Sequence, residues 1–522
     1  MDRKYDGSWI GNYAYSRARL NGDSIALQDL DTGAQYTYLD LDRRANALAH
    51  LLKDQFGVTK GDRVGLISRN RVEMIDCYYA TGKLGAILVP YNDRLSPLEM
   101  SQLMDSEQPK VLIYEDLFAA TVSALGDIGV QHYIVLGSQA ANDHPAYDEL
   151  LATSPTDAIA CPELQLEDIH LIIHTGGTTG LPKGGLISHR SELFNSFNEI
   201  CSWGLTSQDS AVIVLPLFHT GGWNLLTLPL LHVGGTIYLS RAFNPALVLQ
   251  TVVTKHTTCL FGAATIFRMM VEHPNFADAD LSSLRWVMAG AAPTPLTIMQ
   301  AFWEKGVKFV LGYGMTEAGP NNISTPAHLV PQEVVEAKYQ SVGKPMYLSL
   351  VKLLDDDDQE VKAPGVEGEL VWSGPQIFSG YWDNPSETAL TLTDGWVRTG
   401  DMAVFDEDGF YSIVGRKKNM YISGGENVFP PEIETALYAI DGVRECCVFG
   451  VPDEKWGEVG KAIISRMPGY SLTKADVLAG LQGHLARFKM PKYITFVDDV
   501  PKNSVGKIQV AQIVSLYGKS ED

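Results

Sequence analysis

The chain has 522 residues, of which 45% are hydrophobic and 20% are charged, and its formal net charge is −21. This length is too great for one hydrophobic core, so two or more domains are expected. The composition is that of a globular protein, and the negative charge argues against nucleic acid or an anionic membrane as the main partner. Local basic pockets for small anions remain compatible with this charge.

The cysteines and the terminal segments indicate a compartment. The six cysteines show no Cys-x-x-Cys spacing, so we expect neither a disulfide framework nor a zinc site, and a reducing cytoplasm fits. Residues 1–7 are not followed by the apolar stretch of a signal peptide, and no apolar run approaches the length of a membrane span. Residues 518–522 lack a Ser-Lys-Leu peroxisomal signal. We therefore expect a cytoplasmic protein without integral membrane association.

Helix and strand patterns alternate in the first half of the chain. Thr37 and Asp40 form a capping-box pattern ahead of apolar residues at helical spacing, and a second helix is predicted from Leu186 to Ile200. Buried strands are predicted at 63–67, 111–114, 212–215 and 236–239. This alternation predicts stacked parallel or mixed sheets covered by helices, an α/β fold. The acidic run 355–358 is expected to be a solvated hairpin turn without a metal, because consecutive carboxylates cannot all point at one ion.

A loop rich in hydrogen-bond donors lies at 174–184, which reads His-Thr-Gly-Gly-Thr-Thr-Gly-Leu-Pro-Lys-Gly. Glycines let backbone N–H groups turn toward an anion, threonine hydroxyls add donors, and Lys183 supplies positive charge for phosphate. The loop is not a Walker A motif, because Pro182 replaces the glycine before the lysine and Gly184 replaces the hydroxyl residue after it. A phosphate-binding loop is favoured over a plain glycine-rich surface loop.

Three later segments carry residues suited to a nucleotide. Residues 312–317 read Gly-Tyr-Gly-Met-Thr-Glu, in which Tyr313 offers a ring for a purine and Glu317 a hard oxygen ligand for Mg²⁺. The small residues of Gly-Ala-Ala-Pro at 290–293 leave room for a ligand, and Asp401 offers a carboxylate that suits ribose hydroxyls. As alternatives, Glu317 could be a solvated residue in a turn, the small residues at 290–293 could simply allow close backbone packing, and Asp401 could be a turn residue.

A domain boundary is expected near residues 416–420, where a short strand leads into a basic run and a glycine-bearing loop. We therefore assign the domains to 1–416 and 417–522. The second domain is predicted to be a small α+β unit, with helices at 431–439 and 474–485 and strands at 445–451 and 462–466. The adjacent Cys446 and Cys447 should lie on opposite faces of their strand.

In their order along the chain, these motifs resemble those of the adenylate-forming superfamily, which includes acyl-CoA synthetases, stand-alone adenylation domains and firefly-type luciferases. One departure is that His174 precedes Thr175 and Gly176, where the family often has Tyr or Phe followed by Ser-Gly. Thr175 retains the hydroxyl of the family's serine, and His174 is expected to pack at the end of a strand. The resemblance implies a large N-terminal domain of stacked mixed sheets with flanking helices and a small, mobile α+β C-terminal domain.

The resemblance also assigns roles to individual residues. Lys183, Glu317 and Lys507 are the implied catalytic residues, and Glu317 is the implied Mg²⁺ ligand. The implied ATP- and AMP-binding residues are Thr175, Gly176, Gly177, Thr178, Thr179, Gly180, Gly290, Ala291, Ala292, Tyr313, Gly314, Met315, Thr316, Asp401 and Arg416. Lys507 ends the segment 501–507, Pro-Lys-Asn-Ser-Val-Gly-Lys, and its alternative role is that of a solvated surface lysine.

Further implied residues concern the acid, CoA and a hinge. Gly424 and Gly425 would line the tunnel for the pantetheine arm of CoA, where a side chain would obstruct the thiol, and Lys418 would be the pivot of the C-terminal domain. The implied acyl-pocket residues are His219, Thr220, Trp223 and Asn224. A structural histidine is the alternative for His219.

The implied reaction is ATP-dependent activation of a carboxylic acid to acyl-AMP, followed by thioester formation with CoA, with Mg²⁺ required. Segment 218–224 lacks the aspartate that would hold the ammonium of an amino acid. We favour a medium- or long-chain fatty acid, with an aryl or cinnamic-type acid as the alternative. Three less favoured hypotheses are an enzyme that loads a carrier protein, a luciferase-like oxygenase and an inactive binding module. The expected partners are the acid, ATP and CoA, without nucleic acid, and a homodimer is left open.

Overall fold

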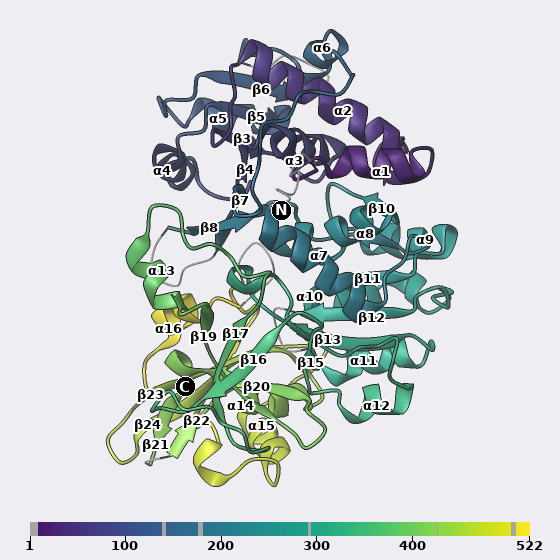
Figure 1. The fold of residues 1–522 in the computed structure, drawn as a ribbon. Coiled ribbons are helices and arrows are strands. Elements are labelled where there is room, and N and C mark those ends of the chain that lie inside the picture. Colours follow the sequence, from purple (N-terminus) through teal and green to yellow (C-terminus); the bar gives the residue numbers. More distant parts are fainter. Residues whose placement is uncertain are drawn as a thin grey trace, which may run out of the picture.

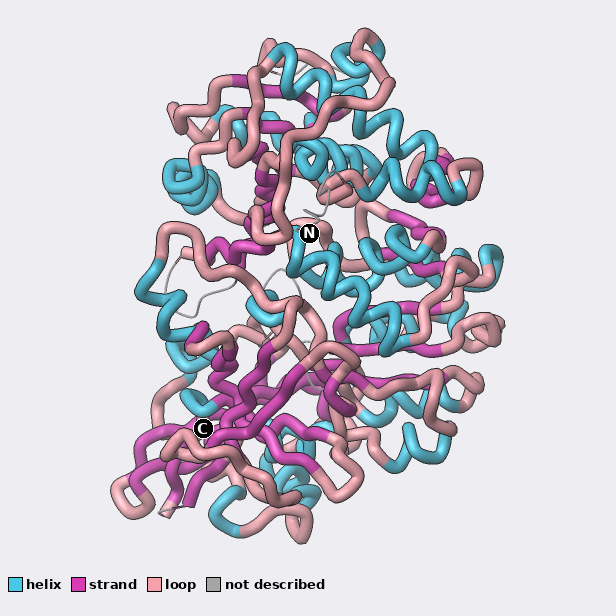
Figure 2. Tube along the Cα trace, viewed as in Figure 1, coloured by secondary structure: helices cyan, strands magenta, loops and turns pink. Residues whose placement is uncertain are grey.

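The computed structural model describes residues 9–137, 142–175, 181–290, 294–424, 426–502 and 508–521. Within these ranges the strands form four sheets, and helices lie against the sheet faces (Figure 1). Figure 2 shows that strands dominate the lower part of the molecule, whereas helices flank the sheets in the upper part. The predicted α/β class with stacked mixed sheets is confirmed. No helix of the described part is long and apolar enough to cross a membrane.

The N-terminal sheet, at the top of Figure 1, ends in the strand that carries Lys183. Its strands run in the order β6 (His132–Leu136), β5 (Val111–Glu115), β3 (Arg63–Ile67), β4 (Ile87–Pro90), β7 (Ile169–Thr175) and β8 (Lys183–Ser188). The pairs from β6 to β7 are parallel, and β8 is antiparallel to β7. The edge position of β8 leaves its second side available to another segment.

The prediction of a helix from Leu186 was wrong at its start. Leu186 lies in β8, because the backbone of this stretch pairs with β7, and the helix α7 (His189–Trp203) begins only after Ser188. The Ser188 hydroxyl caps this helix by accepting from the Ser191 N–H at 3.2 Å. The earlier capping-box prediction is confirmed, since Thr37 caps α2 (Tyr38–His50).

The second sheet extends across the middle of the molecule. Its strands run in the order β15 (Lys344–Pro345), β14 (Ile323–Ser324), β13 (Lys308–Tyr313), β12 (Trp286–Gly290), β11 (Cys259–Ala263), β9 (Ser210–Ile213), β10 (Thr236–Leu239), β1 (Ile25–Asp29) and β2 (Gln35–Thr37). The strands from β13 to β1 are parallel, so the carboxyl ends of β12 and β13 reach the same edge.

Helices complete this N-terminal part. They include α1 (Tyr13–Asn21), α3 (Val72–Leu84), α4 (Pro97–Glu107), α5 (Ala119–Ser123), α6 (Tyr147–Ala152), α8 (Leu228–Val233), α9 (Pro245–Lys255), α10 (Ala264–Val271), α11 (Leu296–Trp303) and α12 (Gln332–Ala337). One buried apolar cluster contains residues of both sheets and of α2 and α3. The two sheets are therefore held together by a shared core.

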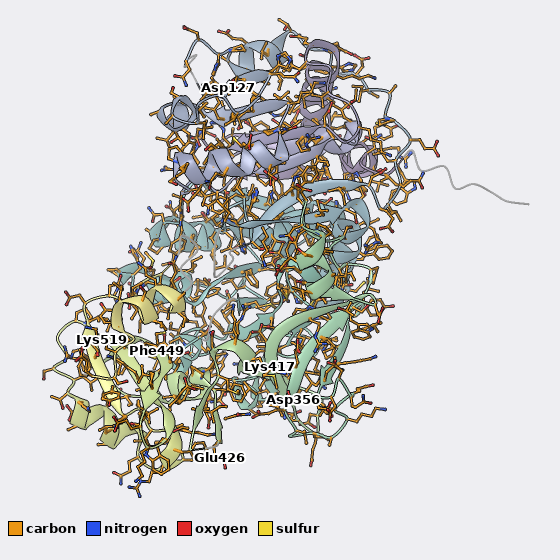
Figure 3. The ribbon with its side chains drawn as sticks, turned by 90° about the vertical axis from the view of Figure 1, so that its left-hand side faces the viewer. Asp127, Asp356, Lys417, Glu426, Phe449 and Lys519 are labelled. Atoms are coloured by element: carbon orange, nitrogen blue, oxygen red, sulfur yellow. The ribbon has the colours of Figure 1, made fainter. Side chains whose placement is uncertain are left out.

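A third sheet carries Asp401. It contains β16 (Leu350–Leu354), β17 (Gly368–Ser373), β19 (Trp396–Phe405), β18 (Leu392–Thr393) and β20 (Tyr411–Arg416), with the helix α13 (Pro385–Thr391) between β17 and β18. The acidic run 355–358 lies between the antiparallel strands β16 and β17, as predicted for a hairpin turn. Asp356 Oδ1 lies 2.8 Å from Lys417 Nζ, and Figure 3 shows the two side chains close together.

The strands after residue 420 form a separate sheet of β22 (Glu426–Val428), β21 (Tyr421–Ser423), β24 (Gly457–Arg466), β23 (Val443–Asp453) and β25 (Tyr493–Val497). The helices of this C-terminal unit are α14 (Pro430–Tyr438), α15 (Lys474–Leu481) and α16 (Val510–Tyr517). Cys446 packs in the core beneath α14 and α15, and Cys447 in the core beneath α16, so their predicted opposite orientation is confirmed. The helix α15 ends before the predicted Leu485, because Gln482 is extended and Gly483 has φ +85°.

Candidate active site

Three polar side chains meet where β13 ends beside β19 and β20. Tyr313, the last residue of β13, donates its hydroxyl to Asp401 Oδ2, and Arg416 Nε lies 2.8 Å from Asp401 Oδ1. Asp401 and Arg416 face each other because they are register partners of β19 and β20. Burial, assisted by the charge of Asp401, raises the pKa of Tyr313 well above its ordinary value. The phenol therefore stays protonated and donates to the buried carboxylate.

A second group surrounds Lys183, the first residue of β8. The Lys183 ammonium contacts the carboxylate of Glu387 in α13 and lies 5.4 Å from the centre of the Tyr381 ring. The Tyr381 hydroxyl donates to Glu317 Oε1 at 2.6 Å. Burial and the Glu317 charge raise the pKa of Tyr381 above its ordinary value. Tyr381 thus connects the lysine predicted to bind phosphate with the glutamate predicted to bind Mg²⁺.

Backbone pairing explains how these residues meet. The segment 379–382 lies along the outer side of β8, where three backbone hydrogen bonds of 2.8 Å join it to Gly184 and Leu186. This pairing sets Tyr381 beside Lys183. The Phe378 N–H also donates to the carbonyl oxygen of Glu317 at 2.9 Å, which fixes the turn that presents the Glu317 side chain.

Tyr381 and Glu387 were not identified from the sequence. The local pattern predicts only a helix start, in which Asn384 precedes Pro385 and its side chain accepts from the Glu387 N–H at 3.1 Å. Nothing in that pattern indicates contact with Lys183, which lies 204 residues earlier than Glu387. No local signal identifies this segment, because its position depends on the edge of β8, a strand that the sequence did not predict.

Positive charge gathers beside Asp401. Lys418 lies in the short turn Lys417–Asn419 that follows β20. Burial lowers the pKa of Lys418, and the neighbouring positive charges of Arg416 and Lys183 lower it further, whereas Asp401 raises it. The positive charges of Lys183 and Arg416 therefore act on Lys418, and the three residues form a cationic region suited to phosphate groups.

The other predicted nucleotide residues border these groups or lie outside the described part. Thr175 ends β7 and is the register partner of Lys183. Gly290 ends β12, and Gly314 to Thr316 lead from β13 into the turn that carries Glu317. A Cβ at Gly314 would lie 2.3 Å from a backbone carbonyl oxygen, so a side chain does not fit there. Outside the described residues are Gly176, Gly177, Thr178, Thr179, Gly180, Ala291, Ala292, Gly425 and Lys507.

The predicted acyl segment is held together by internal contacts. Trp223 is fully buried and stacks on Tyr78, with ring centres 5.3 Å apart. The Asn224 amide donates to the Thr220 hydroxyl at 3.1 Å. The backbone N–H of Gly221 donates to His219 Nδ1, also at 3.1 Å. These contacts shape the wide helical turn from residue 222 to 227.

A small apolar cavity lies beside this segment, with ≈10 Å³ open to the centre of a water molecule. Its lining residues are Val212, Ile213, Val214, Leu215, Gly221, Gly222, Leu225, Leu226 and Phe261. None of them carries a charged or hydrogen-bonding side chain, so the lining has no partner for an ammonium or a second carboxylate. His219, Thr220, Trp223 and Asn224 share the segment with the cavity but are not among its lining residues.

The cavity adjoins the predicted nucleotide side. A Cβ placed on Gly290 would come within 3.0 Å of the Phe261 ring. Gly290 is the first residue of the segment predicted to border both the nucleotide and the acid. Its closeness to Phe261, which lines the cavity, therefore connects the two sides of the site. The small residue at position 290 allows Phe261 to lie this close.

Gly424 lies in the C-terminal unit against Trp456. Its N–H donates to the Trp456 carbonyl oxygen at 2.9 Å, and its φ is +64°, a conformation that favours glycine. A Cβ there would lie 2.9 Å from the indole ring. Any larger residue at position 424 would therefore disturb this loop.

Two groups of residues are candidates for binding a divalent cation. Glu317 is buried, offers carboxylate oxygens and lies in the group that contains Lys183. In the described part of the chain, His170, His189 and Glu192 also lie close enough together to hold a metal. There, however, His170 Nδ1 lies 2.8 Å from Glu192 and Nε2 lies 2.9 Å from the Tyr78 carbonyl oxygen, deep in the core. Mg²⁺ prefers oxygen ligands, so the residues around Glu317 fit it better.

Comparisons with known proteins identify the family of this chain. A protein-family model described as AMP-binding enzyme matches residues 15–382, and one described as AMP-binding enzyme C-terminal domain matches residues 432–507. Feruloyl-CoA synthase from Amycolatopsis sp is 36% identical over 98% of this chain and 99% of its own length. Indoleacetate–CoA ligase from Aromatoleum aromaticum is 34% identical over 92% of this chain and 93% of its own length.

Solved structures of MatB from Rhodopseudomonas palustris have the same fold. ATP-bound MatB matches with a TM-score of 0.88 at 28% identity, covering 98% of this chain and 99% of its own. Apo MatB matches with a TM-score of 0.78 at 29% identity, with the same coverage of both chains. The fold of this chain is therefore more similar to the ATP-bound form.

Proposed function

The chain belongs to the AMP-binding enzyme family and is an AMP-forming acid–thiol ligase that uses ATP, Mg²⁺ and CoA, and we propose that the acid it activates is aromatic. The observation that carries this proposal is the 36% identity to a feruloyl-CoA synthase over nearly the whole chain. The apolar lining of the neighbouring cavity, which includes Gly221, Gly222 and Phe261, is compatible with an aromatic ring. A medium- or long-chain fatty acid is the second candidate, since the same apolar lining suits an alkyl chain.

In the first half-reaction, a carboxylate oxygen of the acid attacks the α-phosphorus of ATP, and pyrophosphate leaves. Two anions approach each other, so the site must supply positive charge and fixed donors. We assign the phosphates to Lys183, Arg416 and Lys507, and the ribose to Asp401. Bound at Glu317, Mg²⁺ would supply charge neutralisation for the phosphates. Tyr313 would then lie against the adenine.

In the second half-reaction, the CoA sulfur attacks the carbonyl carbon of acyl-AMP. AMP leaves with the bonding electron pair, and the thiol proton is released. We propose that residues 417–522 turn about Lys418 between the half-reactions, which brings Lys507 to the site for the first step and the Gly424–Gly425 loop for the second. The six free cysteines fit a reducing compartment such as the cytoplasm.

The experiment that tests this function is a panel of acids incubated with ATP, Mg²⁺ and CoA. The panel holds ferulate, indole-3-acetate, phenylacetate, octanoate and palmitate, and mass spectrometry identifies the thioesters formed. We expect the best aromatic acid to exceed the best fatty acid in kcat/KM by about tenfold or more. The reverse order would replace the proposal with the fatty-acid candidate.

The separation of the two half-reactions has its own test. Lys507→Ala should stop pyrophosphate release but still convert supplied acyl-AMP and CoA into thioester. Gly425→Leu should make acyl-AMP but fail to transfer it, because a branched side chain would block the tunnel. If both half-reactions fall equally in each variant, a fixed active site replaces the hinge.

A further inference from the structure

Glu445, at the start of β23, binds charged groups from two parts of the chain. Lys502 Nζ lies 2.8 Å from each of its carboxylate oxygens. Arg268, on α10 of the N-terminal part, places NH1 3.3 Å from Glu445 Oε1. The exposed fraction is 4% for the Glu445 side chain and 13% for Arg268. A carboxylate this deeply buried depends on its cationic partners, because an unpaired buried charge is costly.

Lys502 also lies at the base of the segment that carries Lys507. Lys502 and Ile508 form an antiparallel β-bridge, and the Gln509 N–H donates to the Pro501 carbonyl oxygen at 3.0 Å. The described residues on either side of 503–507 are therefore joined to each other. Glu445 holds the preceding flank through Lys502, and Arg268 connects the same carboxylate to the N-terminal part.

The contact between Arg268 and Glu445 exists in an arrangement that is closer to ATP-bound MatB than to apo MatB. The TM-scores are 0.88 and 0.78 for the same relative, with equal coverage of this chain. An ion pair that joins the two parts in one arrangement stabilises that arrangement over any other in which the pair is separated.

We propose that Arg268, Glu445 and Lys502 form an interdomain clamp that positions the Lys507 segment for adenylation and opens for thioester formation. The proposal rests on the two half-reactions of the proposed function. Arg268 and Glu445 are positioning residues, since they act through Lys502 and the segment it anchors. The clamp favours one half-reaction at the expense of the other, which a residue that merely stabilises the fold would not do.

The test is Arg268→Met, with each half-reaction measured separately in the full-length protein. ATP–pyrophosphate exchange reports adenylation, and thioester formation from supplied acyl-AMP and CoA reports the second step. We expect adenylation to fall about tenfold, as for loss of one partly buried ion pair, and the second step to change less than about twofold. Arg268→Lys should restore most of the adenylation rate, because its ammonium can still reach Glu445.

Arg285→Met is the matched control. Arg285 NH1 lies 2.6 Å from Asp209, and both residues belong to the N-terminal part. This variant should lower the melting temperature without changing the ratio of the two half-reactions. Lys502→Met provides a second variant of the clamp, which should lower adenylation in the same direction as Arg268→Met.

Two outcomes would overturn the clamp. The first is a parallel fall of both half-reactions in Arg268→Met, matching the control, and the second is an unchanged adenylation rate in both Arg268→Met and Lys502→Met. Failure of the proposed function is distinguishable, because the wild-type protein would then show no exchange with any acid of the panel.

Discussion

The nucleotide side and the acyl side of the candidate site are built differently. On the nucleotide side, polar groups are already paired with other protein groups, as Asp401 is with Tyr313 and Arg416, and Lys183 with Glu387. On the acyl side, the cavity has only apolar side chains and glycines. On the proposed assignment, ATP binding would exchange existing interactions, whereas the acid would contact apolar side chains. Substitutions on one side should change ATP affinity, and substitutions on the other should change the choice of acid.

The largest effect is expected for Asp401→Ala. Loss of a charge-assisted hydrogen bond to the ribose should raise the KM for ATP about ten- to a hundredfold. The ranking of acids in the panel should stay the same, because Asp401 does not line the cavity. Initial rates at varied ATP concentration measure the effect. Since Arg416 loses its partner, the melting temperature must be measured as well, and an unchanged KM in a folded variant would remove Asp401 from the nucleotide side.

Substitutions on the acyl side can either enlarge or narrow the cavity. Phe261→Ala enlarges the cavity beside Gly290 and should shift kcat/KM toward larger acids by about tenfold, while the KM for ATP changes little. Gly221→Ala should narrow the cavity, because its Cβ would lie 3.1 Å from Leu215 Cδ1, and should favour smaller acids. Opposite shifts from this pair would exclude a general loss of stability as the cause. An identical acid profile in both variants would contradict the placement of the pocket.

The same contrast explains what the sequence could predict. The nucleotide side was predicted from local patterns, because donors, a hard oxygen ligand and a ring for stacking are recognisable as residue types at fixed spacing, and its binding role stays a prediction. The alternation of strands and helices predicted the sheets, and His174 packs at the end of β7, where its Nε2 lies 2.7 Å from the buried Glu107. A binding role that depends on residues within one short segment can therefore be predicted before the fold is known.

Contacts formed only by the fold were not predictable in this way. Glu387 reaches Lys183 because the segment 379–382 pairs with β8, and no pattern near either residue indicates that pairing. The same pairing, together with β7, kept Leu186 in a strand despite its helical-looking sequence. The cavity lining was missed because apolar residues such as Val214 and Leu226 look like ordinary core residues until their arrangement is known.

A smaller effect is expected for Glu387→Gln. This change removes the charge that holds Lys183, so the ammonium becomes available to phosphate without first breaking an ion pair. The side chains of Lys183 and Glu387 are each about one-third exposed, so the KM for ATP should fall only about two- to fivefold. Glu333→Gln, at the exposed start of α12, is a control that should leave the KM unchanged. A rise in KM in Glu387→Gln would instead indicate that Glu387 helps to bind the nucleotide.

The smallest expected effect is a pH dependence of ATP affinity. It distinguishes the nucleotide side, which contains a titrating lysine, from the acyl cavity, whose lining does not titrate. Burial, Arg416 and Lys183 lower the pKa of Lys418 below its ordinary value of 10.5. The negative phosphates of ATP should raise it again, so ATP binds with proton uptake when the pH exceeds the pKa of the free protein. Affinity should be complete below that lowered pKa and should weaken as the pH rises through the pKa of the complex.

Calorimetric titration with ATP between about pH 7.5 and 10, in buffers of different ionisation enthalpy, would count the protons taken up. Lys418→Met should flatten the alkaline decline. Lys417→Met should not, because Lys417 is about half exposed and pairs with Asp356 at 2.8 Å on the surface. The ranking of acids should not change over this range, since no lining residue of the cavity titrates. A decline that persists in Lys418→Met would assign the proton uptake to another group on the nucleotide side.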